Sequence, residues 1–143
     1  MTDVVDGVRD HYRATGLIER PKAAYTAFGR EDQLLTPQQL APLDQFHTRG
    51  LAATAELAKA AGITADMSVL DVGSGVGGPA RFLAATYGCR VTGVDLSEPM
   101  VDAARYLTER TGQSGQVSFQ IASARIFHLT TAVSTPCCCN MWR

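Results

Sequence analysis

The chain has 143 residues, 45% hydrophobic and 19% charged, with a formal net charge of −1 at pH 7. This is the size and composition of one globular domain with its own core. A charge this close to zero gives no reason to expect nucleic acid or an anionic membrane as a partner. No run of the sequence approaches the roughly 18 apolar residues of a membrane span, and residues 1–12 carry charges where a signal peptide is apolar. We therefore expect a cytoplasmic protein.

The cysteines do not predict a metal centre or a disulfide framework. Cys89 stands alone, whereas Cys137, Cys138 and Cys139 are consecutive near the end of the chain. Adjacent cysteines cannot easily occupy one tetrahedron, and the C-x-x-C spacing of zinc sites is absent from the sequence. We expect no metal ligands.

Residues 1–66 read as a helical N-terminal extension. Residues 36–39, Thr-Pro-Gln-Gln, have the form of a capping box, with a Thr cap, Pro at the first helical position and Gln at the third. Pro42 then makes this helix short or kinked. A second helix is predicted over residues 48–61, with Gly62 as its end.

From residue 67 onward, predicted strands and helices alternate. Apolar or alternating runs predict strands over residues 68–72, 90–95 and 117–121. Helices are predicted between them, over residues 78–87 and 98–111. Each helix ends at a glycine, and Ser97 is the predicted cap of the second. The order β-α-β-α-β favours an α/β fold with a parallel, doubly wound sheet.

A glycine-rich loop follows the first predicted strand. Gly73, Gly75 and Gly78 fit G-x-G-x-x-G between a strand and a helix, and Asp95 ends the next strand about 20 residues on. Glycines let a ligand approach the backbone, and a helix start offers free N–H groups. Asp95 is placed to accept hydrogen bonds from a ribose diol. The alternative is a tight turn with Asp95 capping the following helix.

Asp71, two residues before Gly73, helps to choose the nucleotide. In a dinucleotide site the pyrophosphate lies over this loop, and a carboxylate there would repel it. S-adenosylmethionine instead carries an ammonium and a sulfonium, and it has no phosphate. Asp71 therefore favours S-adenosylmethionine over a nicotinamide cofactor, although it could also cap the N–H groups of its own loop.

Two stretches carry a specific resemblance. VLDVGSGVGGPARFLA (69–84) and VTGVDLSEPMVDAAR (91–105) resemble motif I and the acidic strand of Rossmann-like S-adenosylmethionine-dependent methyltransferases. The preceding residues 35–58 are similar to the corresponding segment of small-molecule methyltransferases of the sarcosine and dimethylglycine type. The resemblance implies methyl transfer to a small-molecule acceptor, with residues 67–125 as the cofactor-binding half.

The resemblance also implies roles for individual residues. Asp71 would hold the methionine amino group and Asp95 the ribose hydroxyls. The remaining cofactor contacts would come from Gly73, Ser74, Gly75, Leu96, Met100, Ser123 and Ala124. Met100 could equally be a packing residue of its helix. The family usually has Gly-Asp-Ala after the third strand, and here residues 122–124 are Ala-Ser-Ala, which weakens the adenine contact.

No catalytic side chain is assigned. Tyr12, His47 and Arg49 are candidates for a lid or substrate contact, with ordinary packing as the alternative. Methyl transfer does not require an acid–base set, because the sulfonium donor is already activated and alignment supplies much of the acceleration.

Residues 126–143 resemble nothing expected of the family. When their codons are shifted by one base, they permit DLPFDDGSFDAVLLQHVA, which looks like the family's next loop and strand. We therefore expect a frameshifted tail and a truncated methyltransferase with little or no turnover. The other readings are a nicotinamide-dependent oxidoreductase and a non-enzymatic nucleotide-binding module.

Overall fold

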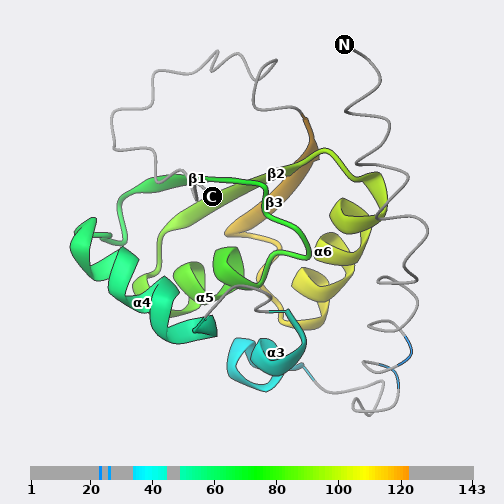
Figure 1. Ribbon diagram of the computed structural model, residues 1–143, viewed down its shortest axis with the longest axis horizontal. Coiled ribbons are helices and arrows are strands. Elements are labelled where there is room, and N and C mark those ends of the chain that lie inside the picture. The colour runs from blue at the N-terminus through cyan, green and yellow to red at the C-terminus, as the bar shows by residue number, and fades with distance from the viewer. Residues whose placement is uncertain (1–22, 24–25, 27–33, 45–48, 123–143) are drawn as a thin grey trace.

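The fold was obtained as a computed structural model, which describes residues 23, 26, 34–44 and 49–122 (Figure 1). The elements in chain order are α3 (Pro37–Asp44), α4 (Gly50–Ala60), β1 (Ser68–Val72), α5 (Gly78–Tyr87), β2 (Arg90–Asp95), α6 (Glu98–Arg110) and β3 (Val117–Ile121). Within these ranges, every helix is too short or too polar to cross a membrane.

The three strands form one parallel sheet in the order β1-β2-β3. Asp71 pairs with Gly93, and Gly93 pairs with Phe119, so the carboxyl ends of the strands meet at one edge. Each strand has the bounds that the sequence predicts, and the α/β fold with sequential parallel strands is confirmed. Ile121 differs from the expected alternation because it is exposed rather than buried.

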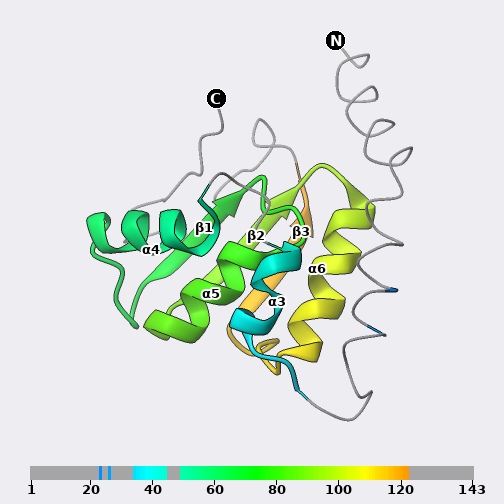
Figure 2. The same cartoon turned by 60° about the horizontal axis from the view of Figure 1, so that its bottom comes forward.

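The described helices form two layers on one face of the sheet. α4, α5 and α6 lie directly against the strands, and α3 lies outside them, over α5 and α6 (Figures 1 and 2). The core between sheet and helices includes Val69, Val91, Val117, Leu83 and Val101. Fully burying such a side chain stabilises the fold by about 1.5–3 kcal/mol.

A second, smaller core joins α3 to the glycine-rich loop and α6. It consists of Leu40, Val76, Met100, Ala103 and Leu107, with Leu35 and Tyr106 packed against it. Leu40 is the α3 side chain in this cluster, and Val76 is the loop side chain. Helix α3 is therefore part of the same hydrophobic cluster as the loop.

The sequence predicts side-chain caps for two of the described helices, and the structure confirms one of them. The Thr36 N–H donates to Gln39 Oε1 at 2.8 Å, and the Gln39 N–H donates to Thr36 Oγ1 at 3.2 Å, which confirms the capping box before α3. Ser97 stands at the cap position of α6, but its side chain makes no capping hydrogen bond. The backbone N–H of Ser97 donates to Asp95 Oδ1 at 2.9 Å, so the contact at the start of α6 is made by the Asp95 carboxylate.

Candidate functional site

The glycine-rich loop connects the carboxyl end of β1 to the start of α5. The Gly73 and Ser74 N–H groups both donate to the Val94 carbonyl, at 2.8 and 3.1 Å, so the loop first runs along β2. Gly73 and Gly75 have φ values of 75° and 51°, the left-handed region that glycine adopts without strain. A Cβ on either would meet no atom within 4 Å. The surface over these two glycines is therefore open to a ligand.

The end of the loop needs glycine because neighbours are close. Gly78 begins α5, and a Cβ there would lie 2.8 Å from Asp44 Oδ1. Gly77 has a φ of 79°, and a Cβ there would lie 2.7 Å from Phe119 Cε1. The motif spacing singled out Gly78 and missed Gly77, although the consecutive pair Gly77-Gly78 in the sequence was a signal for it.

Asp95 joins the loop to the next helix. Its Oδ2 accepts the Gly75 N–H at 2.9 Å, and its Oδ1 accepts the Ser97 N–H at 2.9 Å. A carboxylate offers about four acceptor positions, so two remain for other donors such as hydroxyl groups. The alternative left open by the sequence is thus partly realised: Asp95 caps the start of α6 and still has capacity to bind a ligand.

Asp71 and Ser74 place polar groups in the interior beside the loop. Asp71 is 4% exposed and Ser74 is 6% exposed. Ser74 lies over Gly93, where a Cβ would come within 2.8 Å of Ser74 Oγ. In the part of the chain that the structure describes, this buried hydroxyl has no hydrogen-bond partner. Buried hydroxyls are normally paired, so Ser74 fits a site that is completed by a polar group of a ligand.

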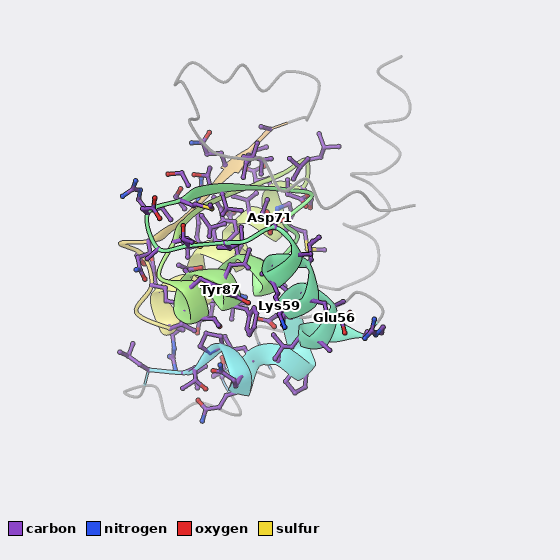
Figure 3. The ribbon with its side chains drawn as sticks, turned by 90° about the vertical axis from the view of Figure 1, so that its left-hand side faces the viewer. Glu56, Lys59, Asp71 and Tyr87 are labelled. Carbon is purple, nitrogen blue, oxygen red and sulfur yellow. The ribbon has the colours of Figure 1, made fainter. Side chains whose placement is uncertain are left out.

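Two hollows flank α4, and only one reaches the site. A cavity of about 20 Å³ borders Asp71 and is lined also by Thr54 and Ala58 of α4. It has room for one water molecule. A wider groove runs past Glu56, Lys59 and Tyr87, whereas Asp71 lies on the sheet above α4 (Figure 3). This groove lies where α4 and α5 end, at the amino ends of the strands, and ligands of such sheets bind at the carboxyl ends.

Three of the other residues singled out in the sequence lie in the described part of the chain. Leu96 is half-buried directly after Asp95. Met100 is 7% exposed in the second core, so packing is the role that the structure displays for it. Arg49 precedes α4 with a φ of 71°, and its guanidinium donates to both carboxylate oxygens of Glu56, at 2.6 and 3.0 Å. The remaining candidates, Tyr12, His47, Ser123 and Ala124, lie outside the described residues.

The family of the chain follows from its similarity to known proteins. Residues 69–141 match the family described as "Methyltransferase domain". The chain belongs to this methyltransferase family. The match covers about half of the chain and begins at the strand that leads into the glycine-rich loop.

Similar proteins of known identity include two kinds of methyltransferase. The sterol 24-C-methyltransferase of Neurospora crassa is 46% identical over 63 residues, which are 44% of this chain and 17% of that protein. The glycine/sarcosine/dimethylglycine N-methyltransferase of Actinopolyspora halophila is 31% identical over 111 residues, which are 78% of this chain and 19% of that protein. The latter match confirms the resemblance seen in residues 35–58. The chain thus spans less than a fifth of either relative.

A solved structure supports the fold. The RNA methyltransferase of Salinibacter ruber in complex with S-adenosyl-L-homocysteine superposes with a TM-score of 0.51 and 22% identity, covering 54% of this chain and 50% of that one. At this level of identity the likeness concerns the Rossmann-like arrangement of strands and helices.

Proposed function

We propose that the protein to which this chain belongs transfers a methyl group from S-adenosylmethionine to a small-molecule acceptor. The observation that carries the proposal is the pairing of the open glycine-rich loop with a carboxylate on each adjacent strand, Asp71 on β1 and Asp95 on β2. Asp95 suits a ribose diol, and Asp71 suits an ammonium and opposes a pyrophosphate over the loop. Family membership supports the same reading, and the relatives named above are methyltransferases rather than nicotinamide-dependent oxidoreductases.

Each residue of the site has a distinct role in this proposal. Asp95 accepts hydrogen bonds from the ribose hydroxyls. It uses the carboxylate lone pairs that are not engaged by the Gly75 and Ser97 N–H groups. Asp71 accepts from the methionine ammonium, and Ser74 Oγ pairs with a polar group of the methionine part. Leu96 flanks the adenine. The bound cofactor supplies a methyl group already activated by the sulfonium, so the protein's contribution is binding and alignment.

The acceptor class rests on the relatives. The proteins that match are named for sterol and for glycine, sarcosine and dimethylglycine methylation, and all of these acceptors are small molecules. The match to the glycine-type enzyme also includes the segment before β1, which precedes the cofactor loop in the chain. A small-molecule acceptor is therefore the proposal for the whole protein.

A pair of ligands tests the role of Asp71. S-adenosylhomocysteine and 5′-methylthioadenosine share the adenosine, but only the first carries the amino acid group. If Asp71 holds the ammonium, the Asp71→Asn variant loses about 10-fold or more in affinity for S-adenosylhomocysteine, as expected for a hydrogen bond to a charged group, and keeps its affinity for methylthioadenosine. Calorimetric titration measures both. Equal losses for the two ligands would show that Asp71 only shapes the loop.

The reading of the tail remains a separate proposal. We infer from the codons that residues 126–143 are translated in a shifted frame, because the other frame permits a loop and strand typical of the family. The family match continues to residue 141 and so includes most of this segment. The nucleotide sequence of this region decides between a shifted frame and a tail that belongs to the family as it stands.

A further inference from the structure

A buried ion pair links the N-terminal extension to the helix that follows the glycine-rich loop. Arg81 Nη2 on α5 donates to Asp44 Oδ2 on α3 at 2.7 Å, and the two side chains are 0% and 1% exposed. Arg81 Nη1 also donates to the Ala104 carbonyl and to Thr108 Oγ1 of α6, both at 3.3 Å. The arginine therefore ties α3, α5 and α6 together at a point that water does not reach.

The ion pair lies directly under the end of the loop. A Cβ added to Gly77 would lie 3.0 Å from Arg81 Nη1, and a Cβ added to Gly78 would lie 2.8 Å from Asp44 Oδ1. The backbone of the last two loop glycines thus rests on these two charged side chains. Gln113 adds a further bond, since its Nε2 donates to the Arg81 carbonyl at 2.8 Å.

We propose that Asp44 is a positioning residue for the cofactor: through Arg81 it fixes the glycine-rich loop in the conformation that binds S-adenosylmethionine. The proposal rests on the proposed function of the loop. It gives α3 a role in cofactor binding, because this helix then contributes to cofactor affinity without contacting the ligand.

Because the pair is buried, removing one of its two charges should disturb the structure around it. Taking both charges out of water carries a large desolvation penalty, which their attraction and added hydrogen bonds repay only in good geometry. Burial raises the pKa of the Asp44 carboxyl, and the neighbouring Arg81 guanidinium counteracts that rise. Removing the carboxylate leaves an uncompensated cation beside Gly77, so the side chain must move or draw in water. Either response changes the contacts that the Arg81 side chain makes beneath the loop.

A comparison at matched stability separates positioning from general destabilisation. Asp44→Asn is compared with Val117→Ala, a substitution in the main core at the amino end of β3. We expect Asp44→Asn to weaken S-adenosylhomocysteine binding about 10-fold or more at a temperature where it is folded, and Val117→Ala to change it less than about 3-fold. Glu56→Gln, which removes an exposed ion pair, is expected to change neither stability nor affinity. If affinity falls in proportion to melting temperature in all variants, the positioning role is refuted.

A measurement on the unaltered chain covers the case in which Asp44→Asn does not fold. Coupling between two sites is reciprocal, so a ligand that favours the loop conformation must also favour the docked α3. Hydrogen exchange of residues 38–44 should therefore slow when S-adenosylhomocysteine is added, and unchanged exchange in a chain that binds the ligand contradicts the proposal. A folded chain that binds no S-adenosylhomocysteine at all refutes the cofactor site proposed for this loop, and the positioning role with it.

Discussion

Asp95 Oδ2 accepts the backbone N–H of Gly75 at 2.9 Å, across the gap between the end of β2 and the glycine-rich loop. The other oxygen of the same carboxylate accepts the N–H of Ser97 at the start of α6. One side chain thus fixes two segments that surround the proposed ribose position. Because these bonds form within the chain, the carboxylate is already oriented and its remaining acceptor positions face a defined direction.

Asp95→Asn tests this arrangement. An amide has one acceptor oxygen, so the variant cannot receive both N–H groups and still bind hydroxyls. We expect S-adenosylhomocysteine affinity to fall by about 10- to 100-fold, the loss of a hydrogen bond to a charged acceptor. Calorimetric titration gives the change, and Asp102→Asn on the exposed side of α6 serves as the control. An Asp95→Asn chain that binds as tightly as the original rules out the ribose role.

The two glycine positions 77 and 115 make a matched pair for stability. Gly77→Ala forces a Cβ toward the Phe119 ring at a φ of 79°, whereas Gly115→Ala meets no atom within 4 Å. Strain and overpacking together are expected to cost about 2–4 kcal/mol at position 77. Urea denaturation measures both variants. The account is wrong on this point if Gly77→Ala is as stable as Gly115→Ala.

Arg49 is expected to be a strained residue rather than a substrate ligand. It holds a φ of 71°, which costs a non-glycine residue about 1–3 kcal/mol, and its charge is already paired with Glu56. Replacing it by glycine in a Glu56→Gln background removes the strain without breaking an ion pair. The double variant should therefore unfold at higher urea than Glu56→Gln alone. An equal or lower midpoint would indicate that this backbone conformation is not strained.

The frameshift reading predicts the DNA sequence and the activity of this chain. Insertion of one base near the codon of Arg125 should open a frame that reads DLPFDDGSFDAVLLQHVA and continues into further strands. The 143-residue chain should then show little or no methyl transfer, because the loop and strand after β3 are replaced. Sequencing of this region and a radiolabelled methyl-transfer assay check the two statements. An interrupted frame, or clear turnover by this chain, rejects the reading.

The strands and the loop could be predicted from the sequence because their signals are local. The strand Ser68–Val72 is a short apolar run that ends at a glycine, and Arg90–Asp95 ends at an acidic residue. The capping box at Thr36 likewise involves residues three positions apart. In each case neighbouring residues both form and bound the element.

Contacts between distant parts of the chain could not be predicted in this way. The ion pair of Asp44 with Arg81 joins residues 37 positions apart, and no local sequence pattern links the two. The need for glycine at position 77 arises from the ring of Phe119, a strand away. At the start of α6 the predicted side-chain cap of Ser97 is absent, and Asp95, placed there by β2, accepts the Ser97 N–H.

The central claim is that this loop binds S-adenosylmethionine and not a dinucleotide. Titration of the 143-residue chain with S-adenosylhomocysteine and with NAD in parallel tests it most directly. The account predicts saturable, stoichiometric binding of S-adenosylhomocysteine and no measurable heat from NAD at the same concentrations. Binding of NAD without binding of S-adenosylhomocysteine would contradict the role given to Asp71.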